Sequence, residues 1–408
     1  MTDQIKVLPL PLIALLGLVV FPNNGFSDDW YRWRGPNLDG LSVETEWRSD
    51  WPEGQVRIAW RIPIGIGFSS VVVSNQRAFT IGHVEGQDIV YAVNVNDGSI
   101  AWQFGYPAAL DDRDFEGGPT STPTVDGDRL FVFSRAGELF CLDIRTGDPI
   151  WKTSVAEEAD VRLPGWGCAA APMIVGDRVL LNIGEAGAAV NKATGKVLWS
   201  SDDREAGYAT PVIIPDSEPA AAMFASGKSY IAVEIESGRQ LWSQRWLTSF
   251  NCNAADPIFF DGRLFLSSGY NRGAALFDVS SSGVQQVWKS KEMKNQIHSS
   301  LLYQNYLYGI DGDMEAGARL RCMDWESGDV KWSQDDLRPG GLTIAGDRLI
   351  VLTESGDLIV APATAKGWKP SSRCQIGEGK YRTSPVLSNG RVYCRSIQGE
   401  LVCIDCRP

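Results

Sequence analysis

Histidine is almost absent from this chain of 408 residues, which contains only His83 and His298. A histidine-rich metal centre is therefore excluded, and a Ser-His-Asp triad has only two residues to draw on. Basic residues are also in short supply, because 38 Lys and Arg face 50 Asp and Glu and give a formal net charge of -12. This charge repels polyphosphate and anionic headgroups, which argues against binding of nucleic acid or of a membrane surface.

Patterns of long helices are scarce, whereas turn-forming and aromatic residues are abundant. The chain contains 42 Gly, 21 Pro and 15 Trp, a composition typical of short strands joined by many tight turns. With 44% hydrophobic residues it can bury a large core. Length alone does not decide between one long repeat domain and two ordinary domains.

Residues 1–27 have the pattern of an export signal. A short polar start precedes an apolar run at residues 7–21, and the small residues Gly25 and Ser27 come before the expected cut. The run is short for a membrane span, yet Asp3 weakens the positive start, so a retained N-terminal anchor is the alternative. No cysteine lies near the cut to accept a lipid. The segment predicts a periplasmic or secreted protein.

A repeat that ends in Gly-x-x-x-Trp runs through the chain. In its fullest forms, residues 94–102, 143–151 and 191–199, an Asn or Asp begins a tight turn, Gly ends it, and Trp follows on the next strand. The repeat tryptophans are Trp102, Trp151, Trp199, Trp242, Trp288 and Trp332, at spacings of 49, 48, 43, 46 and 44 residues. That period is the length of a β-propeller blade, and a Trp on the outer strand is expected to fill the gap to the next blade.

The two ends of the repeat region complement each other. The last unit, residues 381–405, supplies three strands and no Gly-x-x-x-Trp strand, whereas residues 56–60 end in Trp60 with no blade before them. Pairing these ends closes a ring without a free edge. Six full repeats, one degenerate repeat and one composite unit predict an all-β, eight-bladed propeller of four-stranded antiparallel blades. It is expected to span residues 56–408, after a lead-in segment at residues 28–55.

Small residues recur two positions before the turn that precedes each Trp strand. They are Ala92, Cys141, Ala189, Ala232, Cys322 and Cys403. Three cysteines thus occupy positions that need a small buried residue, which favours a structural role over a reactive thiol. Cys394 and Cys403 also flank Gln398-Gly399, and a two-residue turn there would place them opposite each other on adjacent strands. They are the candidate pair for a disulfide, although strand geometry often strains such a bond.

The motif Asp/Asn-x-x-Thr/Ser-Gly-x-x-x-Trp, after a strand that ends small-hydrophobic-Asp, resembles the pyrroloquinoline-quinone-like (PQQ-like) repeat family. That family includes quinoprotein alcohol dehydrogenases and the outer-membrane assembly factor BamB. The resemblance extends over residues 56–405, and Trp-Tyr-Arg-Trp-Arg-Gly-Pro at residues 30–36 is similar to the lead-in of many secreted bacterial members. Repetition of the motif specifies the fold and leaves the activity open.

The resemblance implies two functions, one catalytic and one not. Quinoprotein dehydrogenases hold PQQ beside Ca²⁺ in the central funnel, with carboxylate and amide ligands, an Asp base and commonly an adjacent Cys-Cys disulfide. This chain has no Cys-Cys pair and no long insertions to cap a cofactor. We therefore predict no catalytic residue, no metal site and no cofactor, with a PQQ-dependent oxidoreductase of atypical site as the alternative. A third hypothesis is a carbohydrate-binding or hydrolytic propeller with paired carboxylates among Asp111, Asp112, Asp114 and Glu116.

Residues that precede the first strand of each blade are expected to crowd one end of the ring. The candidates for a ligand or partner face are Arg113, Asp114, Glu116, Arg162, Trp166, Tyr208, Asn251, Asn253, His298, Arg338 and Arg382. This mixture of charged and aromatic residues suits a peptide, a glycan or a protein loop better than a metal, and a solvated rim is the structural alternative. The sequence thus predicts a monomeric, non-catalytic scaffold that binds a protein or polymer partner at one propeller face.

Overall fold

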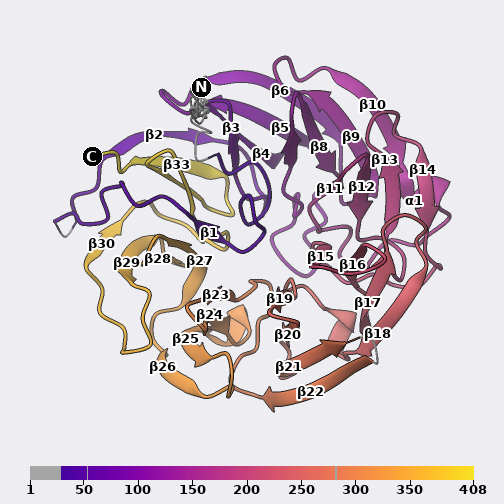
Figure 1. The fold of residues 1–408 in the computed structure, drawn as a ribbon. Coiled ribbons are helices and arrows are strands. Elements are labelled where there is room, and N and C mark those ends of the chain that lie inside the picture. Colours follow the sequence, from indigo (N-terminus) through magenta and orange to yellow (C-terminus); the bar gives the residue numbers. More distant parts are fainter. Residues whose placement is uncertain (1–28, 53, 281–282) are drawn as a thin grey trace, which may run out of the picture.

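The computed structural model describes residues 29–408, apart from residue 53 and residues 281–282. The strands of these residues form eight separate sheets around a central axis (Figure 1). The prediction of an all-β, eight-bladed propeller is confirmed. The export signal predicted at residues 1–27 lies outside the described residues. In the part of the chain that the structure describes, no helix is long and apolar enough to cross a membrane.

Blades 1 to 4 each consist of four strands that are consecutive in the sequence, with the first strand innermost. Blade 1 contains β3 (Val72–Ser74), β4 (Arg77–Val84), β5 (Gln87–Asn94) and β6 (Ile100–Pro107). Blade 2 contains β7 (Thr124–Asp126), β8 (Arg129–Phe133), β9 (Glu138–Asp143) and β10 (Pro149–Ser154). Blade 3 contains β11 (Met173–Val175), β12 (Arg178–Leu181), β13 (Ala188–Asn191) and β14 (Val197–Ser200). Blade 4 contains β15 (Val212–Ile214), β16 (Ala221–Ala225), β17 (Ser229–Glu234) and β18 (Gln240–Arg245).

Blades 5 and 6 follow the same order, and the last two blades each take in a strand from the N-terminal region. Blade 5 contains β19 (Ile258–Phe260), β20 (Arg263–Ser268), β21 (Gly273–Ser280) and β22 (Gly283–Ser290). Blade 6 contains β23 (Leu301–Tyr303), β24 (Tyr306–Asp311), β25 (Arg319–Asp324) and β26 (Val330–Gln334). Blade 7 contains β1 (Leu41–Ser42), β27 (Pro339–Ala345), β28 (Arg348–Thr353), β29 (Asp357–Pro362) and β30 (Ser372–Gln375). Blade 8 contains β2 (Ile58–Pro63), β31 (Val386–Ser388), β32 (Arg391–Arg395) and β33 (Glu400–Asp405). Helical turns are short: α1 (Val155–Glu158) and two 3-10 turns (Ser249–Asn251 and Met314–Ala316).

The ring closes through the pairing of β2 with β33, as predicted. The pair is antiparallel, with Trp60 opposite Cys403, and β2 forms the outer strand of blade 8 (Figure 1). Arg395 on β32 adds a polar link from blade 8 to blade 1. Its Nη1 donates to the carbonyl of Ser69 at 2.8 Å and to Thr80 Oγ1 at 2.9 Å. Arg395 is 1% exposed, and burial lowers the pKa of its guanidinium to about 9.

The recurrent small residues are explained by their partners on the outer strand. They lie directly opposite the repeat tryptophans, in the pairs Ala92–Trp102, Cys141–Trp151, Ala189–Trp199, Ala232–Trp242, Cys322–Trp332 and Cys403–Trp60. Ala or Cys leaves room for the indole in these six blades, whereas in blade 5 Trp288 lies opposite the larger Leu276. All eight cysteines are buried and unbonded, and for Cys141, Cys322 and Cys403 this agrees with the predicted structural role.

The repeat Gly is explained by the tryptophan of the preceding blade. Trp102 Nε1 donates to the carbonyl of Ile144 at 3.0 Å, and a Cβ on Gly147 would lie 2.5 Å from the Trp102 ring. Gly147 also has a φ of 78°, which favours glycine on its own. The same Trp-on-Gly contact recurs in the pairs Trp60–Gly98, Trp151–Gly195, Trp199–Gly238 and Trp288–Gly328. These five tryptophans pack against the turn of the next blade, which agrees with the expected inter-blade role.

The predicted disulfide between Cys394 and Cys403 is wrong. Ser396 N–H donates to the Glu400 carbonyl at 2.9 Å, so the turn contains three residues instead of two. This shifts the register by one, and Cys403 lies opposite Tyr393 while Cys394 lies opposite Val402. Because successive side chains point to opposite faces of a strand, the two thiols face different inter-blade cores.

The lead-in segment closes the end of the central channel at which the innermost strands finish. The carbonyls of Trp30 and Tyr31 accept hydrogen bonds at 2.9 Å from the N–H groups of Val73 on β3 and Val125 on β7. The short strand β1 then runs parallel to β27, near the centre of the ring in Figure 1. Farther along, Trp47 and Trp51 are buried in the core shared by blades 7 and 8. The lead-in is therefore an integral part of the propeller.

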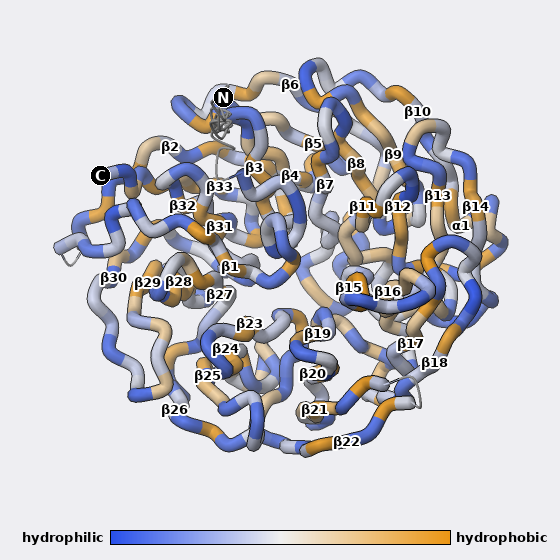
Figure 2. The backbone as a smooth tube through the Cα atoms, viewed as in Figure 1, coloured by the Kyte–Doolittle hydropathy of each residue, from blue (hydrophilic) through white to orange (hydrophobic). Residues whose placement is uncertain are grey.

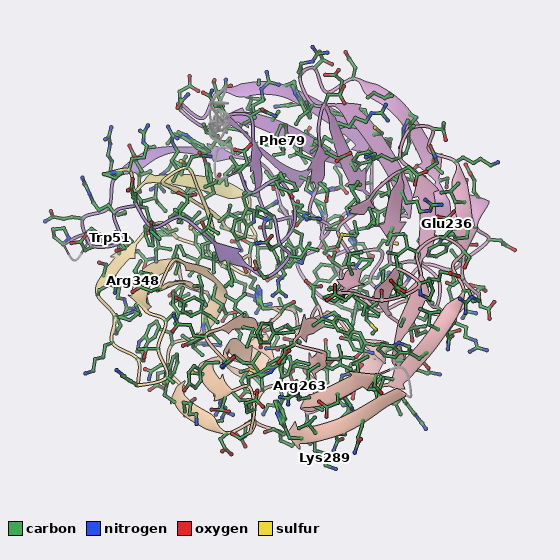
Figure 3. The ribbon with its side chains drawn as sticks, viewed as in Figure 1. Trp51, Phe79, Glu236, Arg263, Lys289 and Arg348 are labelled. Atoms are coloured by element: carbon green, nitrogen blue, oxygen red, sulfur yellow. The ribbon has the colours of Figure 1, made fainter. Side chains whose placement is uncertain are left out.

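Hydrophobic residues lie along the strands, and hydrophilic residues gather in turns and on the outer surface (Figure 2). Phe79, labelled in Figure 3, is fully buried inside the ring, whereas Glu236 and Lys289 lie on its periphery. The core therefore consists of the interfaces between blades and positions the loops at the two ends of the ring.

Candidate functional site: a cavity at the propeller mouth

In every blade the innermost strand starts at the same face of the ring, so the loops before these strands gather there. The turns between second and third strands return to this face, which is called the mouth below. A cavity of about 290 Å³ opens at the mouth. Five of the predicted residues line it: Asp114, Trp166, Tyr208, His298 and Arg382. The lead-in lies at the opposite end of the channel, and its Trp33 also lines the cavity.

Six aromatic side chains form most of the wall. They are Trp33, Phe68, Phe115, Trp166, Tyr208 and Tyr270. Phe68 and Phe115 pack with ring centroids 5.5 Å apart, and Trp166 packs 5.6 Å from Tyr208. Trp166 is fixed in orientation, because its Nε1 donates to Asp114 Oδ2 at 3.0 Å and its backbone N–H donates to Tyr208 Oη at 3.3 Å.

Trp33, from the lead-in, forms the floor of the cavity together with Asp256. Its Nε1 donates to Asp256 Oδ2 at 2.7 Å, and Arg34 Nη1 lies 3.5 Å from the same oxygen. Burial raises the pKa of Asp256, and Arg34 and the hydrogen bonds oppose this shift. The second carboxylate oxygen accepts the backbone N–H of Thr210 at 2.8 Å. Asp256 therefore anchors the lead-in to the ring.

Phe250 stands on the rim of the cavity and is 70% exposed. Its ring lies 5.5 Å from Tyr270 and 6.4 Å from Trp166, so it continues the aromatic wall towards solvent. Its φ of 61° is a left-handed conformation that costs a non-glycine residue about 1–2 kcal/mol. The rim thus carries apolar surface that the fold does not bury.

Arg382 is the cation of the cavity wall, and its charge is balanced within the protein. Its Nε donates to Glu354 Oε1 at 2.8 Å, and its Nη2 donates to Glu315 Oε1 at 2.7 Å. The hydrogen bond from Arg382 lowers the pKa of Glu315. Glu315 is also 4.0 Å from Lys380, which donates to Glu116 at 2.7 Å. Cations and carboxylates alternate along this side of the mouth.

His298 lies deep in the wall and is 6% exposed. Burial lowers the pKa of its imidazole to about 4, the charge of Arg382 lowers it further, and a hydrogen bond with the Gly340 backbone acts in the opposite direction. The ring is therefore neutral at pH 7. Its Nε2 makes no hydrogen bond with the described residues.

The other predicted mouth residues do not line the cavity. Asn253 is fully buried, and its Nδ2 donates to the Ser226 carbonyl at 2.9 Å and to the Trp246 carbonyl at 3.0 Å. Its prediction as a mouth contact is wrong, because the amide satisfies backbone groups inside the blade. The remaining five are held by neighbouring groups: Arg113 by Asp111, Glu116 by Lys380, Arg162 by Asp203, Asn251 by Glu205 and Arg338 by Glu354.

Several residues of the cavity were not predicted from the sequence. Phe68 and Phe115 lie in the loops before β3 and β7, and Phe115 stands between the predicted residues Asp114 and Glu116. Tyr270 and Glu315 come from the turns between second and third strands, which return to the same face in any four-stranded meander. That alternation of strand direction could have predicted Tyr270 and Glu315 from the sequence. No sequence signal could have predicted Trp33, because the repeat pattern does not place the lead-in near the central axis of the ring.

The cavity does not fit a quinone with Ca²⁺. Among residues 29–52, 54–280 and 283–408, no three His, Cys, Asp or Glu side chains are grouped so that they could hold a metal ion. The three carboxylates that line the cavity, Asp114, Asp256 and Glu315, already accept hydrogen bonds from protein groups. Calcium needs six to eight oxygen ligands, and this wall does not assemble them.

Solved structures share the fold of this chain at low sequence identity. BamB from Moraxella catarrhalis superposes with a TM-score of 0.63 at 20% identity, covering 86% of this chain and 98% of that one. Quinohemoprotein alcohol dehydrogenase from Comamonas testosteroni superposes with a TM-score of 0.69 at 12% identity, covering 92% of this chain and 80% of that one. These similarities show the propeller fold alone.

Sequence relatives point to one branch of these propellers. The outer membrane protein assembly factor BamB of Shewanella oneidensis is 24% identical over 341 residues, which cover 79% of this chain and 78% of that protein. The protein of the same name in Yersinia pestis is 25% identical over 238 residues, 54% of each chain. The sequence profile described as outer membrane protein assembly factor BamB matches residues 86–334, more than half of the chain, and the chain therefore belongs to this family.

Proposed function

We propose that the chain is a non-catalytic periplasmic scaffold that binds a protein partner at the mouth of its propeller. Membership of the BamB family supports this, because the relatives in S. oneidensis and Y. pestis are named as outer membrane protein assembly factors. Such a name implies a protein client in preference to a glycan or a small metabolite.

One observation carries the choice of surface. Phe250 is held in a left-handed backbone conformation with 70% of its surface exposed, directly beside the aromatic cavity. Strained residues persist where the surrounding structure fixes them, and they cluster at binding sites. Exposed aromatic residues above a preformed pocket are the usual anchors of protein interfaces. The mouth therefore serves as the contact surface of a monomeric propeller.

The domain organisation that accompanies this proposal has three parts. Residues 1–27 act as an export signal, residues 28–55 as the lead-in and residues 56–408 as the propeller. N-terminal sequencing of the protein from a periplasmic extract tests this division. A mature chain that begins near residue 28 is expected, whereas a chain that retains residues 1–27 would indicate an N-terminal anchor.

Site-specific photo-crosslinking tests the contact surface. A photoreactive phenylalanine analogue at position 250 is expected to give a discrete protein adduct in cells that produce the full chain. The matched control is position 260, because Phe260 is 48% exposed at the opposite end of the ring. Mass spectrometry identifies the adduct. A glycan adduct, or equal protein adducts at both positions, would contradict the proposal.

The shared fold of quinohemoprotein dehydrogenases makes redox catalysis the second candidate. Purified protein mixed with PQQ and Ca²⁺ is expected to show neither dye-linked oxidation of alcohols or sugars nor a rise in melting temperature. A tight cofactor would stabilise the folded state, so both readouts respond to it. Turnover that persists through repeated purification would replace the scaffold by an enzyme.

A further inference from the structure

The charges on the cavity wall indicate that its ligand is not an anion. Arg382, the cation of the lining, is balanced by Glu315 and Glu354. Burial keeps His298 neutral at pH 7, and Asp256 on the floor is paired with Arg34. An anionic ligand would lose its hydration without gaining an unpaired cation, which is unfavourable in a confined site.

The size and lining of the cavity indicate one flat ring. Its volume of about 290 Å³ is at the lower limit of the roughly 300–1,000 Å³ typical of small-molecule sites. Two aromatic pairs line the wall, Phe68–Phe115 from the loops before β3 and β7 and Trp166–Tyr208 from the loops before β11 and β15. Rings in such surroundings form offset or edge-to-face pairs that aliphatic groups cannot form.

The rim indicates that this ring belongs to a larger molecule. Phe250 exposes apolar surface next to the opening, and a free small molecule inside the cavity would leave that surface in water. A polypeptide that inserts one side chain would cover it. Exposed apolar surface beside a preformed pocket therefore indicates a protein ligand, which can cover both, in preference to a metabolite.

We propose that the cavity receives a single uncharged aromatic side chain, such as tyrosine, from the protein partner. The ring packs between the two aromatic pairs above Trp33, and the partner's backbone passes over Phe250. This inference rests on the proposed function and adds the chemistry of the anchor. It predicts that affinity depends on the aromatic character and the neutrality of that one side chain.

The test uses the full chain and blocked amino acids as probes. His298 reports occupancy by NMR, and His83 serves as an internal reference because it pairs with Asp88 at 2.8 Å and does not line the cavity. N-acetyl-tyrosinamide is expected to shift the His298 resonances and leave those of His83 unchanged. It should bind about fivefold more tightly than N-acetyl-leucinamide, because ring–ring contacts add about 1 kcal/mol to the free energy gained by burying apolar surface. The O-phosphorylated tyrosine probe and N-acetylglucosamine should cause no shift.

A variant pair locates the binding to the wall. Trp166→Leu should weaken binding of N-acetyl-tyrosinamide about fivefold, whereas Phe260→Leu, at the opposite end of the ring, should leave it unchanged. Melting curves check that both variants fold, and if Trp166→Leu does not fold, the wild-type shifts decide alone. Equal binding of the leucine and tyrosine probes, or a His298 shift with the sugar alone, would overturn the inference. Absence of tyrosine binding together with a protein adduct at position 250 would overturn it while leaving the proposed function in place.

Discussion

His298 makes the stability of the protein depend on pH. Its pKa is about 4 in the folded chain against an ordinary value of 6.5, because burial disfavours the charged ring. Between these values the unfolded chain binds a proton that the folded chain does not. Stability is therefore complete above pH 6.5 and falls as the pH drops towards 4, by about 3 kcal/mol in total.

The effect is measured by comparing urea unfolding of the wild type and His298→Gln at pH 7.5 and pH 5. The free energy of unfolding of the wild type should fall by about 2 kcal/mol more than that of the variant over this interval. The reason is that pH 5 lies 1.5 units below the unfolded-state pKa of 6.5 and above the folded-state pKa, and each pH unit in this range costs about 1.4 kcal/mol. Carboxylates titrate equally in both proteins and cancel in the difference. Identical pH dependence of the two proteins would show that His298 is not buried as a neutral group.

The cysteines show what single residues reveal in advance. Burial raises the pKa of Cys141 to about 11 and that of Cys322 to about 12, so both are inert thiols. Their structural role was predictable, because each occupies the small position of the repeat. The pairing of Cys394 was not, because Gln398-Gly399 is compatible with a turn of two or three residues. One residue in the turn decides which face of the strand a thiol occupies.

At the scale of the turns, Gly147 and Gly127 form a matched pair. Both have positive φ, at 78° and 61°, but only Gly147 faces the ring of Trp102, and no atom lies within 4 Å of a Cβ built on Gly127. Gly127→Ala should therefore lower the free energy of unfolding by about 1 kcal/mol, from backbone strain alone. Gly147→Ala should lower it by about 2–4 kcal/mol, because the Trp102 ring must also move. Chemical denaturation measures both values, and equal losses would mean that the Trp-on-Gly contact does not constrain the turn.

The mouth loops were predictable as a group, and their charge pairs were not. The direction of the strands brings every loop before an innermost strand to one face, so Trp166, Tyr208 and Arg382 meet at the cavity. From the sequence Arg382 was a candidate for the partner face, with a solvated rim as the alternative. In the structure its side chain is 9% exposed, because Glu315 and Glu354 from blades 6 and 7 hold it. Such pairing depends on side-chain reach across loops that are distant in the sequence, which a repeat pattern does not encode.

At the scale of the whole molecule, ring closure should depend on β2. A variant without residues 28–62 leaves β33 with an uncovered edge, and it is expected to aggregate or to melt at least roughly 10 °C lower. A variant without residues 28–42 keeps β2 and loses only the part of the lead-in that closes the channel. Light scattering and thermal melts should find it monomeric. Aggregation of both variants to the same extent would assign the defect to the lead-in and not to the closing strand.

Closure through β2 also sets an order of events during synthesis. Each of the first seven blades contains four consecutive strands and can form as soon as its own stretch of chain has emerged. Blade 8 cannot form in this way, because Ile58 on β2 pairs with Ile404 on β33, which is synthesised last. At roughly 5–20 residues per second, the nascent chain holds β2 without its partner for on the order of half a minute. The time during which β2 is unpaired and exposed to aggregation is therefore set by the number of residues between β2 and β33. It does not depend on how fast any single blade folds.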